Sequence, residues 1–261
     1  ENELMSLPHA LKSIHFPIDS QDAANARKRL AFDELLILQL GMLTMKNHSR
    51  EKTAYIMDKN TDMTAFFGSL PFEMTDAQKK SISDVINDMS TDSPMNRLLQ
   101  GDVGSGKTAV AAAACYFACQ NGFQSALMAP TEILAVQHYN TLKSFLEPIG
   151  VNVVLLTGSM TAKQKRIAKE ALKSGEAAVA AGTHAIIQKD VEFQRLGLVI
   201  TDEQHRFGVA QRAALADKGN SPHRLVMSAT PIPRTLALII YGDLDISIIN
   251  QMPKGRLPVK T

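Results

Sequence analysis

Eight consecutive residues have the types and spacing that hold a triphosphate. Residues 101–108 read Gly-Asp-Val-Gly-Ser-Gly-Lys-Thr and match the pattern G-x-x-x-x-G-K-[ST] at every fixed position. In such a loop the glycines let backbone N–H groups surround the β-phosphate. Lys107 brings a positive charge to the β- and γ-phosphates, and the hydroxyl of Thr108 is a ligand for Mg²⁺. We expect a nucleoside triphosphate to bind here, at Gly101, Asp102, Val103, Gly104, Ser105, Gly106, Lys107 and Thr108.

The residues on both sides of this loop support that interpretation. Leu98 to Gln100 is a plausible strand end, and Ala109 to Cys119 is a strong helix former. A phosphate in the loop would therefore lie at a helix N-terminus, where the backbone N–H groups have no partner within the helix. The alternative, a chance glycine-rich turn, is poor because both flanks fit.

A second acidic element follows another apolar run. Leu196 to Thr201 is a predicted strand, and Asp202 and Glu203 come directly after it. Asp202 can hold Mg²⁺ through water, and Glu203 can polarise the attacking water in an in-line phosphoryl transfer. An Asp-Glu pair alone is ordinarily a solvated strand end, but with the phosphate loop it predicts a nucleoside triphosphatase. The expected catalytic residues are Glu203, Lys107 and Asp202, and the expected Mg²⁺ ligands are Thr108 and Asp202.

Two further polar segments could respond to the bound nucleotide. His205 follows the acidic pair and could sense the γ-phosphate, although a lone histidine is usually structural. Ser228 and Thr230 follow a predicted strand, and their hydroxyls could bond His205 and the acidic pair, which would couple nucleotide state to a moving segment. A Ser/Thr-rich turn before Pro231 is the simpler alternative.

Two segments have residues suited to a nucleic-acid phosphate. Thr131 and Glu132 open one predicted helix, and Gly182, Thr183 and His184 follow another apolar strand. Hydroxyls and backbone donors at such positions can bind a phosphate backbone. Simple helix capping by the two threonines is the alternative.

The elements that must position these residues alternate along the chain. A helix is expected over residues 22–45, capped by Asp22 and lined by leucines, followed by a polar stretch to residue 70 that is a linker or an exposed helical end. Apolar runs are found at 97–99, 125–129, 151–156, 177–181, 196–201 and 224–227, and helical patterns at 76–89, 107–120, 132–147, 161–174, 208–217 and 233–240. This order predicts a parallel sheet with helices on both faces.

Composition and charge set the broader limits. The 261 residues are 45% hydrophobic and 21% charged, with a net charge of +2, which is ordinary for a globular protein. Residues 1–149 hold 13 Lys and Arg against 17 Asp and Glu, whereas residues 150–261 hold 15 against 9. The basic surplus is therefore confined to the second part. Much of it lies in the predicted helix 161–174, which is either a solvated face or a surface near a phosphate backbone.

The cysteine content indicates the cellular compartment. Its two cysteines, Cys115 and Cys119, make no disulfide framework and suit a cytosolic protein with reduced thiols. No signal peptide or membrane span is visible. The sequence begins without Met and ends in a Pro-rich stretch, so we expect it to be cut at both ends.

The motifs occur in the order of a superfamily 2 helicase motor. Gln78 precedes the phosphate loop, after Leu70-Pro71-Phe72, and resembles the adenine-reading glutamine of such motors. Residues 202–209 read Asp-Glu-Gln-His-Arg-Phe-Gly-Val, residues 230–235 read Thr-Pro-Ile-Pro-Arg-Thr, and residues 29–35 read Arg-Leu-Ala-Phe-Asp-Glu-Leu. Together these segments resemble the bacterial RecG family of ATP-dependent DNA helicases over nearly the whole chain. The motor of the transcription-repair coupling factor is the nearest competitor.

The resemblance implies a RecA-like P-loop NTPase lobe and a specific activity. Residues 71–261 would be the first motor lobe, residues 1–70 a helical connector from a wedge domain, and residues 250–261 the start of a linker to a second lobe. ATP and Mg²⁺ would be the cofactors, with Phe72, Gln78 and His205 joining the phosphate loop in binding. The DNA-contacting or coupling residues would be Thr131, Glu132, Gly182, Thr183, His184, Ser228 and Thr230.

The family's activity is translocation on double-stranded DNA that remodels stalled forks and Holliday junctions in recombination and repair. The resemblance also implies a monomer in the bacterial cytoplasm, associated with the nucleoid, whose wedge domain and second lobe lie outside this chain. The isolated chain is then expected to hydrolyse ATP weakly or not at all. A nucleotide-switch ATPase without translocation is a further alternative.

Overall fold

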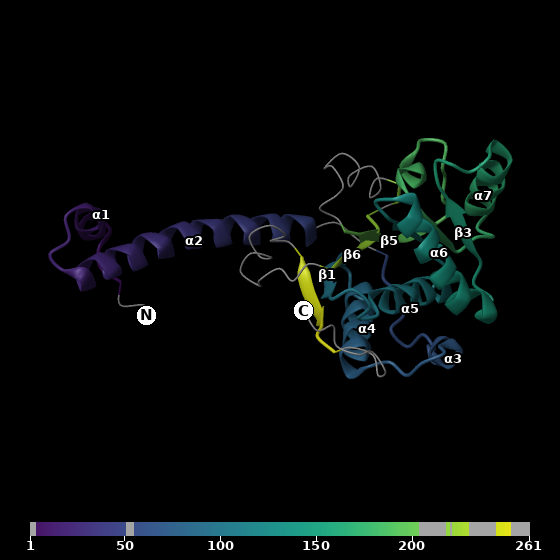
Figure 1. Ribbon diagram of the computed structural model, residues 1–261, viewed down its shortest axis with the longest axis horizontal. Helices are drawn as coiled ribbons and strands as arrows, with labels where there is room; N and C mark the ends of the chain where they lie inside the picture. Colours follow the sequence, from purple (N-terminus) through teal and green to yellow (C-terminus); the bar gives the residue numbers. More distant parts are fainter. Residues whose placement is uncertain (1–3, 51–54, 204–217, 220, 230–243, 252–261) are drawn as a thin grey trace. The chain divides into compact units, whose positions relative to one another are not determined.

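The computed structural model describes residues 4–50, 55–203, 218–219, 221–229 and 244–251 (Figure 1). Contacts between Cα atoms divide the chain into two compact units. One unit contains helices α1 and α2, and the other contains a β-sheet with its helices. Residues 55–70 group with the sheet unit, although the sequence reading placed them in the connector. The assignment of residues 1–70 to a connector from a wedge domain stays a prediction.

The first unit consists of α1 (Leu7–His15) and α2 (Ser20–Arg50). The expected helix therefore begins two residues earlier than predicted and includes the start of the polar stretch. The carboxylate of Asp19 accepts from the Asp22 N–H at 2.7 Å and caps the first turn. Asp22, the predicted cap, instead accepts from the Ile18 N–H at 3.1 Å. Much of the predicted leucine face of α2 is exposed, at Leu35, Leu36, Leu38, Leu40 and Leu43.

The second unit is built on a seven-stranded sheet in which the strands pair in parallel. The strands are β1 (Asn96–Gly101), β2 (Gln124–Met128), β3 (Val153–Leu156), β4 (Val179–Gly182), β5 (Leu196–Asp202), β6 (His223–Ser228) and β7 (Asp245–Ile249). Their order across the sheet is β3-β4-β2-β5-β6-β1-β7. The six predicted strands are confirmed, and β7 was not predicted.

Helices pack on this sheet, and all but the first of them lie where the 3.6-residue patterns predicted them. They are α3 (Thr64–Ser69), α4 (Asp76–Met89), α5 (Lys107–Gln120), α6 (Glu132–Leu146) and α7 (Ala162–Ser174), with 3₁₀ turns η1 (Glu147–Ile149) and η2 (His184–Ile187). Threonine side chains cap α4, α6 and α7. The Thr75 and Thr161 side chains form capping boxes with Gln78 and Gln164. The predicted helices 208–217 and 233–240 lie outside the described residues.

Two hydrophobic cores cover the two faces of the sheet. Side chains alternate along β2, so that Leu127 enters one core while Ala126 and Met128 enter the other. Helices α4, α5 and α6 pack in the first core, and α7 packs in the second. Residues 109–118 of α5 are all buried, because their alanines let the helix approach its neighbours closely. Helices on both faces of a parallel sheet are therefore confirmed.

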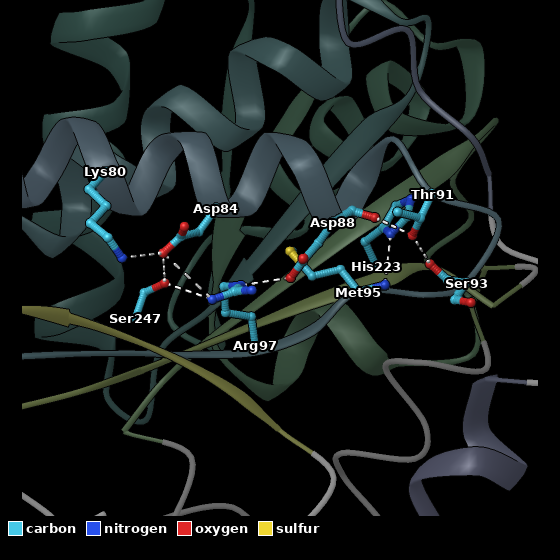
Figure 2. A network of polar contacts seen from close by, with 9 residues as sticks. All are labelled: Lys80, Asp84, Asp88, Thr91, Ser93, Met95, Arg97, His223 and Ser247. Carbon is cyan, nitrogen blue, oxygen red and sulfur yellow. Dashed lines mark hydrogen bonds and ion pairs between the residues drawn. The ribbon is translucent and has the colours of Figure 1, made fainter.

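A polar network secures α4 and the edge strand β7 to β1 (Figure 2). Arg97, at the start of β1, bonds Asp88 of α4 at 2.7 Å and the hydroxyl of Ser247 in β7 at 2.8 Å. Ser247 in turn donates to Asp84 of α4 at 2.8 Å. One guanidinium thus joins three elements. Because α4 also carries Gln78, this network contributes to the position of the phosphate loop.

His223 ties the start of β6 to its neighbours in the same region (Figure 2). Its Nδ1 accepts from the Met95 N–H at 3.0 Å, and its Nε2 donates to the Tyr55 carbonyl at 2.6 Å. A backbone N–H can only donate and a carbonyl can only accept, so these two partners fix the neutral ring. Burial lowers the pKa of His223, against smaller opposing effects of the Tyr55 bond and the Asp88 charge.

Candidate nucleotide and magnesium site

The phosphate loop connects β1 to α5, and its glycines meet strict geometric limits. Gly106 has a φ of 91°, in the left-handed region that side chains rarely adopt. A Cβ there would lie 2.1 Å from Nε2 of Gln78. At Gly101, a Cβ would lie 2.6 Å from Oγ of Ser105. The predicted strand–loop–helix arrangement is therefore present, with α5 beginning at Lys107.

Lys107 turns back over the loop that precedes it. Its Nζ donates to the carbonyl of Gly101 at 2.5 Å and to that of Asp102 at 3.0 Å. The side chain is half-buried, and this desolvation lowers the pKa of Lys107, while the carboxylates of Asp202, Glu203 and Asp102 oppose the shift. The Lys107 ammonium thus lies in the negative field of the acidic pair, as a residue that balances phosphate charge should.

Parallel register brings the acidic pair to the same edge of the sheet as the phosphate loop. Gln100 of β1 pairs with Ser228 of β6, and Met227 of β6 pairs with Asp202 of β5. The carboxyl ends of three adjacent strands therefore meet, and ligands bind parallel α/β sheets at such edges. Lys107 and Asp202 are far apart in sequence, and the parallel pairing of β5, β6 and β1 brings them to the same edge.

A histidine that was not predicted joins the two expected magnesium ligands. Nε2 of His138 lies 2.8 Å from Oδ2 of Asp202, and its Nδ1 lies 3.5 Å from Oγ1 of Thr108. His138 and Asp202 are both buried. The sequence held one signal, because His138 falls between Ala135 and Leu142 at helical spacing on the buried face of α6.

Glu203 has an unusual backbone and a definite partner. Its φ of 49° is positive, which is uncommon for a residue other than glycine and is often found at functional sites. Its Oε1 accepts from the N–H of Ala229 at 2.9 Å, and its own N–H donates to the Met227 carbonyl at 2.9 Å. Glu203 is thus bonded to a backbone N–H of the segment after β6, and the expected bonds from the Ser228 and Thr230 hydroxyls stay a prediction. His205 and Thr230 lie outside the described residues.

Gln78 braces the phosphate loop. Its Oε1 accepts from the Thr75 N–H at 2.9 Å, and its Nε2 donates to the Ser105 carbonyl at 2.7 Å. The side chain is 1% exposed. Phe72 is partly exposed and packs edge-on against Phe145. Contact of Gln78 and Phe72 with an adenine stays a prediction.

The residues expected to contact DNA differ in their exposure. Thr131 and His184 are exposed, whereas Gly182 and Thr183 are buried. A Cβ at Gly182 would lie 2.0 Å from the Leu156 carbonyl, so this glycine allows β3 and β4 to pack closely.

Two of these residues also have local partners. The Thr131 hydroxyl accepts from the Leu134 N–H at 3.3 Å, so it caps α6 as the alternative interpretation held. Glu132 accepts from the Ser159 N–H at 2.9 Å, and its bonding to Ser159 lowers the pKa of this carboxyl. Both contacts are compatible with a nearby phosphate backbone, and DNA contact stays a prediction.

Three lysines of α7 have partners of their own. Lys169 bonds Asp190, and Lys173 bonds Glu192 at 2.7 Å. Lys165 donates to the Gly158 carbonyl at 2.6 Å. These contacts favour the interpretation of α7 as a solvated, paired face over that of a bare phosphate-binding surface.

A model of the DEAD/DEAH box helicase family matches residues 75–239. The chain belongs to this family. The match begins at the capping threonine of α4 and includes the phosphate loop, His138 and the acidic pair. Membership explains why the motifs occur in this order along a RecA-like sheet.

Individual relatives are similar over nearly the whole chain. The ATP-dependent DNA helicase RecG of Synechocystis sp. is 48% identical over 261 residues, which are 99% of this chain and 31% of the relative. That of Bacillus subtilis is 49% identical over 254 residues, 97% of this chain and 37% of the relative. A solved structure of RecG bound to a three-way DNA junction matches with a TM-score of 0.86 and 43% identity, over 99% of this chain and 35% of that one. The chain spans about a third of the length of these relatives.

Two other features are not found among the described residues. No helix in that part of the chain has the length and apolar character to cross a membrane. Nor does it contain three or more His, Cys, Asp or Glu side chains grouped to hold a metal ion. A magnesium ion bound through phosphates and water needs only one or two protein ligands. The hydroxyl of Thr108 and the carboxylate of Asp202, joined through one imidazole ring, fit that requirement.

Proposed function

We propose that the chain is the ATP-binding lobe of a RecG-type helicase, a translocase on double-stranded DNA that remodels stalled forks and Holliday junctions. The observation that carries this proposal is the meeting of three groups at one sheet edge: the phosphate loop, the acidic pair and the Ala229 N–H. The first two groups supply nucleotide chemistry. The third joins Glu203 to the segment after β6, which would move with Glu203 when the nucleotide state changes. A ligand-dependent change at Glu203 therefore has a direct route to the backbone after β6.

The roles of the residues follow from their positions. N–H groups of the loop and of the first turn of α5 would surround the phosphates, and Lys107 would exchange its carbonyl partners for phosphate oxygens. Thr108 and Asp202 would hold Mg²⁺, which neutralises phosphate charge when bound. Glu203 would orient and deprotonate the attacking water, and its bond to Ala229 would position the carboxylate.

The remaining parts of the proposal concern partners. A wedge domain and a second RecA-like lobe would belong to the same polypeptide, and the enzyme would act as a monomer on chromosomal DNA in the bacterial cytoplasm. Gln78 and Phe72 would contact the adenine, and His205 would sense the γ-phosphate. Branched DNA would be the substrate, approached from the edge of the sheet where Thr131, His184 and Ser228 lie.

Nucleotide titration tests the site directly. With a fluorescent ATP analogue and Mg²⁺, the 261-residue chain should bind the analogue, and Lys107→Ala should abolish or greatly weaken binding while the circular dichroism spectrum is unchanged. Lys163→Ala, an exposed lysine on α7, is the matched control and should bind normally. Equal affinity of the wild type and Lys107→Ala would reject the site.

DNA dependence separates the proposal from a nucleotide switch. In the full-length protein, ATP hydrolysis should rise when a three-way DNA junction is added. Hydrolysis that is indifferent to DNA would favour the switch. Stimulation that depended on RNA polymerase would instead favour the relative that couples transcription to repair.

A further inference from the structure

We infer that His138 is a positioning residue of the magnesium–nucleotide site, an inference that rests on the proposed function. Its imidazole ring is inserted between the two expected magnesium ligands, with Nε2 at 2.8 Å from Asp202 and Nδ1 at 3.5 Å from Thr108. The ring comes from α6, an element that holds neither the phosphate loop nor the acidic pair. It touches both ligands from a third direction.

The chemistry of the three groups gives each bond a direction. An ionised Asp202 can only accept, so Nε2 of His138 carries the proton and donates to Oδ2. In the neutral ring with this tautomer, Nδ1 is an acceptor toward which the Thr108 hydroxyl can donate. When the Thr108 hydroxyl proton points at the ring, its oxygen lone pairs point away from the ring. They are then available to a cation, as the lone pairs of a hydroxyl ligand must be. The His138 ring therefore fixes the orientation of both ligands.

Burial and packing hold the ring in that position. His138 lies 8% exposed on the core-facing side of α6, between Ala135 and Leu142, and Asp202 is also 8% exposed. A buried carboxylate without a partner is costly, so the bond to His138 also satisfies a polar group that the fold buries. Hydrogen-bond partners of metal ligands typically change metal affinity about 10–100-fold when removed.

The same helix begins at the edge where DNA contact is predicted. Thr131 caps α6, and His138 lies seven residues later, about two helical turns along it. The helix is a rigid element, so its N-terminus and His138 move together. Through His138, the expected magnesium ligands therefore contact α6, the helix whose N-terminus at Thr131 lies where DNA contact is predicted.

The test measures how strongly Mg²⁺ supports nucleotide binding. The affinity of the 261-residue chain for fluorescent AMP-PNP is determined with excess Mg²⁺ and again with EDTA. The dissociation constant in EDTA divided by that in Mg²⁺ is the magnesium factor. His138→Leu and His138→Asn remove the bond to Asp202, by loss of the polar atoms or by shorter reach. Both should lower the magnesium factor about 10–100-fold and leave affinity in EDTA unchanged.

Two variants complete the experiment. His138→Gln places an amide near the Nε2 position and should restore the factor to within about threefold of wild type, by the reach of its side chain. Asn140→Ala, an exposed change on the same helix, should have no effect. Unchanged magnesium factors in both removing variants, or a factor in His138→Gln as low as theirs, would overturn the inference.

An unchanged affinity in EDTA shows that a variant is folded. If His138→Leu does not fold, His138→Asn still tests the inference. Failure of the wild-type chain to bind AMP-PNP at all would reject the proposed function. Normal wild-type binding with an indifferent His138 would reject only the inference.

Discussion

At the scale of single residues, the site is formed by side chains that constrain one another. Gln78 links the start of α4 to Ser105, and Ala229 holds Glu203. The sequence predicted the chemical groups at Lys107 and Asp202 because their roles depend on local pattern. It did not predict these contacts, since they depend on which elements the fold brings together.

Gly106 offers a test at this scale. Gly106→Ala should weaken nucleotide binding at least about tenfold and lower the unfolding temperature, because a left-handed alanine costs about 1–2 kcal/mol. Its Cβ would also displace the Gln78 amide from Ser105. Fluorescent nucleotide titration and thermal melts measure both effects. Gly68→Ala, where a Cβ meets nothing within 4 Å, is the control and should preserve binding.

At the scale of elements, the interior strands were predictable and the edge strand was not. β2 and β5 are buried throughout, and each contains an apolar run, at residues 126–128 and 198–200. β7 alternates in burial, contains Asp245 and Ser247, and is held partly by the Arg97 network, so its sequence lacked that signal. The short helix α3 was also missed, since six residues give too little periodicity.

The Arg97 network predicts a stability effect of this edge. Arg97→Met should destabilise the sheet unit by about 1–3 kcal/mol, since it removes charged hydrogen bonds to Asp88 and Ser247 while keeping an apolar stem. Urea unfolding followed by circular dichroism measures the loss. Arg166→Met, whose pair with Glu170 is exposed, should change stability by less than about 0.5 kcal/mol. Equal effects of the two changes would contradict the role given to the network.

His223 predicts how these contacts depend on pH. Its folded-state pKa lies below the ordinary value of 6.5, so the unfolded chain takes up this proton first on acidification. Its stabilising contribution is therefore complete above pH 6.5 and declines as the pH falls toward the folded pKa, by at most about 1.4 kcal/mol per pH unit.

Urea unfolding between pH 5 and 7.5 tests this sign. The stability difference between wild type and His223→Gln should shrink as the pH falls. Asn140→Ala, an exposed change that removes no titratable group, is the control and should show a difference that is independent of pH. A difference that grew on acidification would contradict the burial argument.

At the scale of the whole molecule, the sheet unit is one lobe with its chemistry on one edge. The order of the motifs predicted the fold and the family, because each motif must follow the carboxyl end of a particular strand. His138, seven positions after Thr131, shows why the motifs alone could not predict every residue of the site. Only the packed helix reveals which of its side chains reaches Asp202.

The last prediction concerns the proposed second lobe. The chain spans about a third of its RecG relatives, and the proposed second lobe would supply arginines to the γ-phosphate. Arginines provided in this way are worth about 10³–10⁵ in rate. The 261-residue chain should therefore bind ATP with Mg²⁺ yet hydrolyse it about 10³-fold or more slowly than the full-length protein on a DNA junction. Phosphate release measures both rates, and Glu203→Gln in each protein sets the background. Turnover by the chain at the full-length rate would show that its own residues complete the catalytic site.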